Sequence, residues 1–147
     1  MVLLFEWPET EFVWLDAAKH SAEFLGWAVE RLRVTDRVHV AHGRAEDLGR
    51  SSALRGGLEV VVSRSFGRPA TTAECAAPFL VAGGHLVVSE PPAQRGDRWD
   101  EAGLARLGLE LAGRSSEVAN YQVLRQGERC PDTFPRRNGR PGKRPLF

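Results

Sequence analysis

Short apolar runs alternate with amphipathic segments along most of this chain. Over Ala17–Arg33, apolar residues recur at steps of three and four, which is the spacing of a helix with one buried face. Thr71–Leu80 and Trp99–Gly108 are the other segments for which we expect helices. The runs with strand character are Phe12–Leu15, Val38–Ala41, Leu58–Ser63 and His85–Val88.

Local signals refine these expectations. Leu58–Ser63 holds three consecutive valines, as in strands that are buried on both faces. Thr71 or Thr72 is expected near the N-cap of its helix. Gly83-Gly84 is expected to turn the chain into the strand that follows.

The last third of the chain has a different pattern. Leu109–Leu111 and Val118–Leu124 predict a closing antiparallel pair, and Pro91–Arg98 reads as a polar loop. From Gly127 onward the chain is rich in Pro, Gly and Arg, and we expect it to be extended. Alternation of strand and helix predicts an α/β fold with a mostly parallel sheet, in which ligands bind beyond the carboxyl ends of the strands.

Composition adds one feature to this picture. The chain has 147 residues, 42% of them hydrophobic, which suits one globular domain. Residues 131–147 carry five basic side chains against Asp132, whereas the other residues carry 15 basic and 18 acidic ones. We therefore divide the chain into a body, residues 1–130, and a basic tail, residues 131–147, of the kind that reaches nucleic acid.

Other classes of function lack support in the sequence. Cys75 and Cys130 have no metal-ligand spacing and read as reduced thiols of a cytoplasmic protein. The histidines form no ligand pattern, so no metal is expected. No apolar run approaches the roughly 20 residues that a membrane helix needs, so no membrane partner is expected.

Polar residues gather where the expected strands end. Asp16, His42–Asp47, Ser63–Phe66 and Ser89–Pro92 all fall at carboxyl ends, which meet at one edge of a parallel sheet. A carboxylate at the end of a buried strand, as at Asp16, usually holds the ribose of a nucleotide cofactor. Asp16 also suits a plainer role as a helix cap.

The order of these segments resembles the glucose-inhibited division protein B family. The resemblance is carried by Asp16 and its helix, by Gly43-Arg44-Ala45-Glu46-Asp47 and by Val61-Val62-Ser63-Arg64-Ser65-Phe66. The ending Phe134–Leu146 is similar to the Pro-Arg-x-x-Gly-x-Pro-x-Lys-x-Pro-Leu ending of many members. This family consists of S-adenosylmethionine-dependent enzymes that methylate guanine N7 in 16S ribosomal RNA.

The resemblance implies a Rossmann-like class I methyltransferase sheet and a set of site residues. Asp16 would hold the cofactor ribose, Ala45 and Glu46 would lie along the adenine, and Arg64 would reach the cofactor or the RNA. No catalytic acid or base is expected, because guanine N7 already carries a free lone pair and methyl transfer needs mainly alignment. The RNA-binding residues would be Arg44, Arg136, Arg137, Arg140, Lys143 and Arg144.

The chain departs from the family pattern in two places. The family's first strand and glycine-rich loop would precede Phe12, and none of the residues before Phe12 is Gly. The missing strand belongs between Phe12–Leu15 and Leu58–Ser63, so two strand edges should lack a partner unless Val2–Phe5 fills the gap. Ser89-Glu90-Pro91-Pro92 stands where the family usually has Lys-Gly, which replaces a cation by an anion.

Three hypotheses remain open at this point. The chain belongs to an rRNA methyltransferase whose upstream codons encode the missing strand and loop. Alternatively, it is a truncated, non-catalytic remnant that binds RNA or a partner, with a frame break upstream. As a third possibility it is a class I methyltransferase with another substrate, since the fold does not fix the substrate. Loss of RNA binding on deletion of residues 131–147 would argue against the third hypothesis.

Overall fold

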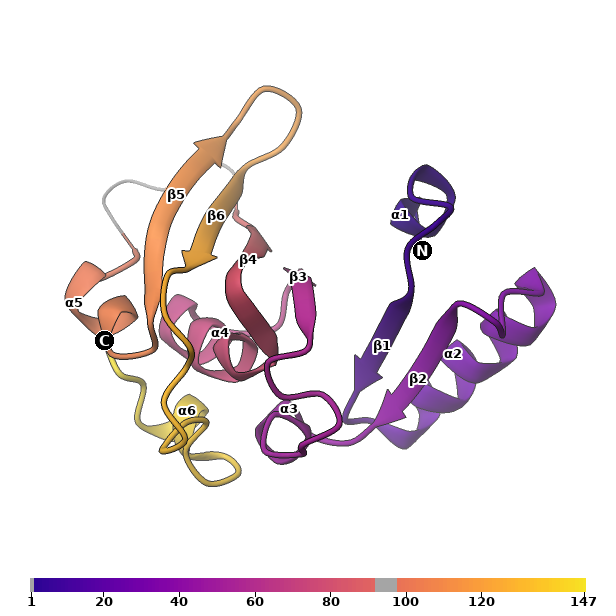
Figure 1. Cartoon of the computed structure of the whole chain (residues 1–147), viewed down its shortest axis with the longest axis horizontal. Helices are drawn as coiled ribbons and strands as arrows, with labels where there is room; N and C mark the ends of the chain where they lie inside the picture. The colour runs from indigo at the N-terminus through magenta and orange to yellow at the C-terminus, as the bar shows by residue number, and fades with distance from the viewer. Residues whose placement is uncertain (1, 92–97) are drawn as a thin grey trace. The chain divides into compact units, whose positions relative to one another are not determined.

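A computed structural model describes residues 2–91 and 98–147, and the chain forms two compact units (Figure 1). The first unit is Met1–Ala45 and the second is Glu46–Phe147. Each has its own hydrophobic cluster. The expected loop Pro91–Arg98 falls largely on residues 92–97, outside the described residues.

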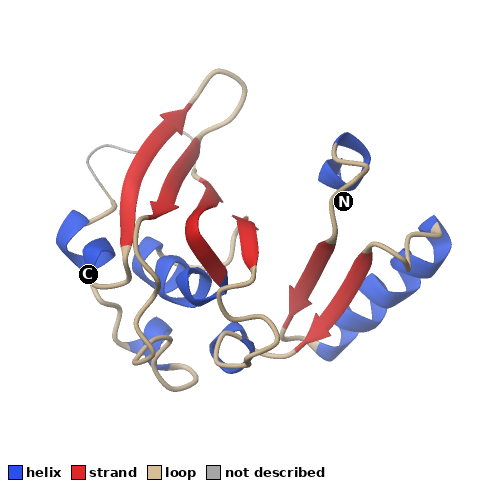
Figure 2. Ribbon diagram, viewed as in Figure 1, coloured by secondary structure: helices blue, strands red, loops and turns tan. Residues whose placement is uncertain are grey.

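The first unit is a parallel strand pair with one long helix (Figure 2). Helix α2 begins and ends close to its expected bounds, because its apolar face packs on the strands and Arg33 closes it in a left-handed conformation. The elements are α1 (Val2–Glu6), β1 (Phe12–Asp16), α2 (Lys19–Leu32) and β2 (Val38–His42).

A small cluster holds the first unit together. Leu4 of α1, Val29 of α2 and Val38 of β2 are buried, and Phe12 and Trp14 of β1 pack against them. The Val2–Phe5 segment is therefore helical, and the idea that it serves as a makeshift strand is wrong. In this helix the Leu4 side chain is buried in the cluster.

The second unit is built on a four-stranded sheet in the order β3-β4-β6-β5. β3 and β4 are parallel, and the β4–β6 and β5–β6 pairs are antiparallel. The expected α/β class, with a mostly parallel arrangement and a closing antiparallel pair, is confirmed. The elements are α3 (Ala45–Leu48), β3 (Leu58–Ser63), α4 (Pro69–Ala76), η1 (Ala77–Phe79), β4 (Leu80–Ser89), α5 (Glu101–Ala105), β5 (Leu109–Ser115), β6 (Tyr121–Gln126) and α6 (Arg140–Lys143).

The core of the second unit lies between this sheet and α4, α5 and the C-terminal segment. Leu80 and Leu86 of β4, Leu104 of α5 and Leu124 of β6 are at most 1% exposed. Near the end of the chain, Phe134 is also buried in this cluster. The closing antiparallel pair therefore supplies core residues as well as the end of the sheet.

Three local expectations need correction. β3 is not buried on both faces: Val60 is 41% and Val62 54% exposed, because only the Val61 face meets the core. The N-cap of α4 is Arg68, with Pro69 in the first turn, rather than Thr71 or Thr72. Gly83 and Gly84 lie inside β4 and do not precede it.

The glycine pair produces an irregularity in β4. The register with β3 shifts between Leu58 and Val60, and Gly83 has φ +87°. A Cβ on Gly84 would lie 2.9 Å from the Glu59 carbonyl oxygen. β4 thus passes this point only because both residues lack a side chain.

Four strand edges, those of β1, β2, β3 and β5, have no ladder partner within the described residues. β1 pairs with β2 alone, and β3 pairs with β4 alone. The edges of β1 and β3 are the two for which the sequence predicts a gap. Unpaired edges leave backbone N–H and C=O groups without strand partners, so each is a site where another strand can add.

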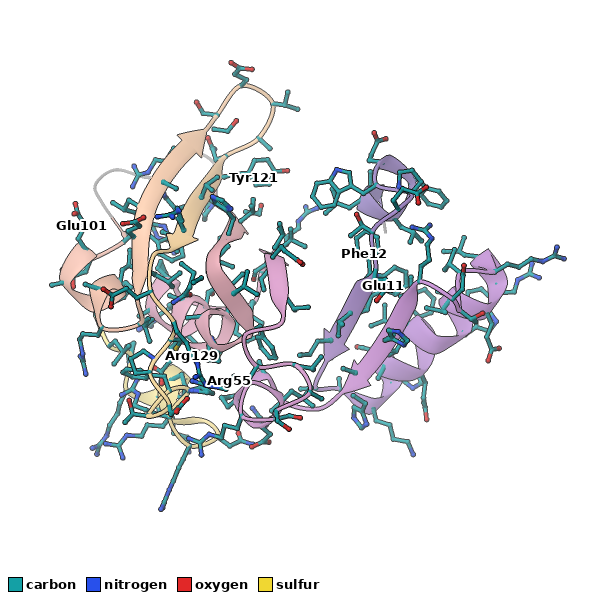
Figure 3. The ribbon with its side chains drawn as sticks, in the orientation of Figure 1. Glu11, Phe12, Arg55, Glu101, Tyr121 and Arg129 are labelled. Carbon is teal, nitrogen blue, oxygen red and sulfur yellow. The ribbon has the colours of Figure 1, made fainter. Side chains whose placement is uncertain are left out.

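The C-terminal segment, residues 127–147, is not an extended tail. It folds back on the second unit, where Phe134, Pro135 and Pro141 are buried and α6 forms. The Arg55 guanidinium donates to the carbonyl oxygens of Cys130 and Phe134 at 3.0 and 2.8 Å. Figure 3 shows Arg55 beside this segment.

The strongest tie to this segment is the Glu74 carboxylate of α4. Glu74 is fully buried, and it accepts from Arg136 through Nε at 2.8 Å, Nη2 at 2.6 Å and the backbone N at 2.8 Å. The same Nη2 donates to the Arg144 carbonyl oxygen at 2.7 Å. The hydrogen bond to Glu74 raises the pKa of Arg136. Among the described residues, the folded-back segment alone satisfies this buried carboxylate.

We expect Glu74→Gln to lower the free energy of unfolding by about 3–5 kcal/mol, because it breaks a buried ion pair and leaves Arg136 without its partner charge. Urea unfolding followed by circular dichroism measures the change. Glu117→Gln, on an exposed loop residue, is the matched control. We call the Glu74–Arg136 ion pair the clamp. A free energy of unfolding for Glu74→Gln within about 0.5 kcal/mol of the parent protein, as for most surface substitutions, would contradict its importance.

Candidate functional site

Asp16 lies at the carboxyl end of β1 in the first unit. Its Oδ1 accepts a hydrogen bond from the backbone N of Ala18 at 2.7 Å, so it orders the turn into α2. The N-cap position itself is Ala18, which has no side-chain cap. The other carboxylate oxygen of Asp16 has no donor among the described residues, and the side chain lines an open surface pocket with residues of α2. The helix-capping role therefore uses only half of this carboxylate.

Ala45 and Glu46 begin α3, a short helix of four residues. Both are buried, and the Glu46 Oε1 accepts from the backbone N of Gly139 at 3.0 Å. Asp47 accepts from the Asn138 side chain at 3.0 Å. The Glu46 and Asp47 carboxylates therefore hold the C-terminal segment in place. A role along a cofactor adenine stays a prediction for Ala45 and Glu46.

Arg64 follows β3 and is exposed, with no polar partner among the described residues. It lines a pocket of about 340 Å³ together with Phe66, Glu90 and Trp99. The next residue, Ser65, has φ +54°, an uncommon conformation for a residue other than Gly. This turn presents Arg64 and Phe66 at the end of the strand, where the sequence predicts a site.

The expected RNA-binding cations fall into two groups. Arg136 is bound to Glu74, so its guanidinium is already used within the fold. The others are exposed, and their side chains have no polar partner in the described part of the chain. They are Arg44 in the first unit and Arg137, Arg140, Lys143 and Arg144 in the second.

The sequence alone did not identify the residues that hold the C-terminal segment and its cations in place. Glu74 is the one charged residue of a helix that otherwise consists of small, uncharged side chains, and that isolation is the signal in the sequence. Arg50 and Arg55 lie between α3 and β3, and both donate to carbonyl oxygens of the C-terminal segment. Nothing local marks these contacts, because the accepting carbonyl oxygens of the C-terminal segment lie more than 70 residues away.

Neither cysteine has the exposure or the lowered pKa of a reactive thiol. Both thiols are free and buried. Burial raises the pKa of Cys75 to about 12, with Glu46 and Glu74 adding to the effect, and burial raises that of Cys130 to about 11 against the opposing charge of Arg55.

Two kinds of feature are absent from the described residues. Within residues 2–91 and 98–147, no group of His, Cys, Asp or Glu could hold a metal ion. None of the helices described is long and apolar enough to cross a membrane.

Solved structures define the class of the fold. The antibiotic-resistance methyltransferase Kmr matches 84% of this chain and 78% of its own with a TM-score of 0.65 at 12% identity. Cofactor-bound Rv0187 from MTB matches 83% of this chain and 64% of its own with a TM-score of 0.54 at 19% identity. The fold is that of the Rossmann-like class I methyltransferases.

Sequence relatives then narrow the class. The chain is 32% identical, over 99% of its length, to ribosomal RNA small subunit methyltransferase G of Streptococcus pyogenes serotypes M3 and M1. The resemblance to the glucose-inhibited division protein B family is confirmed at this level of similarity. The chain spans 63% of the length of these relatives. No protein-family model matches it.

The buried thiols provide a test of the second unit's packing. At about pH 8 we expect a disulfide reagent to modify Cys75 and Cys130 roughly 100-fold more slowly in the folded protein than in urea, because the thiolate is the reactive form and both pKa values are raised. The absorbance of the released thiol measures the rate. Rapid modification of either cysteine in the folded chain would contradict this packing.

Proposed function

We propose that this chain supplies part of an S-adenosylmethionine-dependent methyltransferase of small-subunit ribosomal RNA, with guanine N7 as the methyl acceptor. The observation that carries the proposal is the similarity to ribosomal RNA small subunit methyltransferase G along 99% of the chain. Ribosomal RNA as substrate implies a cytoplasmic location and the small ribosomal subunit or its RNA as partner.

Asp16 supports the cofactor part of the proposal. A carboxylate oxygen without a donor among the described residues, at the carboxyl end of a strand, fits a ribose hydroxyl, which donates to it. The bond from the Ala18 N–H fixes the orientation of the carboxylate before any ligand arrives. When bound, S-adenosylmethionine supplies a methyl group on a sulfonium.

The Glu46 side chain is buried and its Oε1 accepts from the backbone N of Gly139, so we assign this carboxylate to the C-terminal segment. What α3 offers is backbone and the small Ala45, against which a flat ring can pack. The proposal therefore assigns Ala45 and the backbone of Glu46 to the adenine, and the Glu46 carboxylate to the C-terminal segment.

The exposed cations of the C-terminal segment support the RNA part. Arg137, Arg140, Lys143 and Arg144 lie on or beside α6, and the Glu74–Arg136 clamp fixes the segment that carries them. Phosphate contacts of this kind position a protein on RNA and make binding depend on salt. Guanine N7 needs no base to activate it, so the chemistry requires residues that orient the RNA.

We expect Asp16→Asn to weaken binding of S-adenosylhomocysteine to the whole chain by about tenfold or more, because an amide replaces a charged acceptor. Titration calorimetry measures the affinity. Glu11→Gln, an exposed carboxylate just before β1 (Figure 3), should leave it unchanged. If the parent chain binds no S-adenosylhomocysteine, the cofactor part of the proposal fails and a non-catalytic remnant is favoured.

For RNA, charge substitution is a sharper test than deletion of residues 131–147, because that segment is part of the core. We expect the double substitution Arg137→Gln and Arg140→Gln to weaken 16S ribosomal RNA binding and to lower its salt-dependence slope by about 0.7–0.9 for each phosphate that is no longer neutralised. Filter binding at several salt concentrations measures both quantities. The matched control is Arg31→Gln with Arg106→Gln, two exposed arginines elsewhere, and an equal effect of both pairs would refute a specific surface.

A further inference from the structure

We propose that the pocket at the carboxyl ends of β3 and β4 receives a guanine base of the RNA and that Glu90 reads its Watson–Crick edge. This inference rests on the proposed function and adds to it the residue that selects the base. It concerns the second unit alone.

The pocket is formed by loops that follow two adjacent parallel strands. β3 ends at Ser63 and β4 at Ser89, so the residues after them share one edge of the sheet, the usual place for a ligand in such folds. The volume of about 340 Å³ lies within the usual range for small-ligand pockets, about 300–1,000 Å³.

Glu90 is held in one orientation in the wall of this pocket. Its Oε1 accepts from the indole Nε1 of Trp99 at 2.9 Å, and its Oε2 accepts from Nη1 of Arg98 at 2.5 Å. The Glu90 side chain is 15% exposed, so it still reaches solvent on the pocket side. Each carboxylate oxygen accepts about two hydrogen bonds, and the described residues donate one to each oxygen of Glu90, which leaves a second acceptor site on each for a ligand that donates.

Guanine matches that pair of free acceptor sites. Its Watson–Crick edge carries the N1–H and the N2 amino group as adjacent donors, whereas adenine presents an acceptor at N1, which the carboxylate would repel. A base held in this way turns its N7 edge away from Glu90 and leaves N7 open to reaction. The selecting group is thus a carboxylate at the position where the family pattern has a lysine.

The other walls suit a flat, polar ring. Phe66 is 50% exposed and offers a face on which a base can stack. Arg64, also exposed, provides a donor for the O6 or a phosphate of the same nucleotide. Proteins that act on a base commonly combine such stacking with hydrogen bonds to the Watson–Crick edge.

The test uses the whole chain and fluorescein-labelled uridine pentamers that differ only in the central base. We expect the pentamer with guanine to bind about tenfold or more tightly than the one with adenine, as measured by fluorescence anisotropy at one salt concentration. An inosine pentamer, which lacks the N2 amino group, should lie between them.

Two variants separate base selection from general binding. Glu90→Gln should remove most of the preference for guanine, while Phe66→Ala should weaken both pentamers by similar factors. Phe66 is half exposed, so its removal leaves the core intact. Glu101→Gln, an exposed carboxylate at the start of α5 (Figure 3), should change neither the affinity nor the preference.

Two outcomes would overturn the inference: equal binding of the guanine and adenine pentamers by the parent chain, or an unchanged preference in Glu90→Gln. Either result leaves the proposed function standing if the chain still binds S-adenosylhomocysteine. Loss of that binding in the parent chain would instead count against the proposed function itself.

Discussion

The second unit depends on one buried charge. The Glu74 carboxylate is fully enclosed, and a charge in such a place is tolerated only when it is paired and hydrogen-bonded. Arg136 meets both needs with its side chain and its backbone N–H. Residues near the end of the chain are therefore required to complete a helix that begins at Pro69.

This constraint decides which cations are available for function. The ion pair with Glu74 uses the Arg136 side chain, and the bond from its Nη2 to the Arg144 carbonyl oxygen brings the following turn close to α4. Glu46 and Asp47 hold Gly139 and Asn138 in the same way. The remaining basic side chains of the segment are then displayed on an ordered surface, which under the proposed function costs less conformational entropy on RNA binding than a flexible tail would.

Strands β1 and β3 carry candidate functional residues at their carboxyl ends. β3 exposes Val60 and Val62 on one face and carries Arg64 at its end, and β1 carries Asp16 at its end. Both strands have one edge without a ladder partner in the part of the chain that the structure describes. The chemistry-bearing residues thus follow strands that keep backbone groups free for further pairing.

The strands, helix α2 and the residues at the strand ends could be predicted from the amino-acid order, because they depend on periodicity and on turns that a few neighbouring residues specify. The family resemblance was also present there, in Asp16, the segment at Arg44–Asp47 and the segment ending at Phe66. Folding in three dimensions was needed to show that Arg136 is a clamp while Arg137 is exposed, and that Gly83-Gly84 lies within a strand. The reason is physical: Arg136 and Arg137 are alike in sequence, and what separates them is a buried partner 62 residues away, which no local pattern encodes.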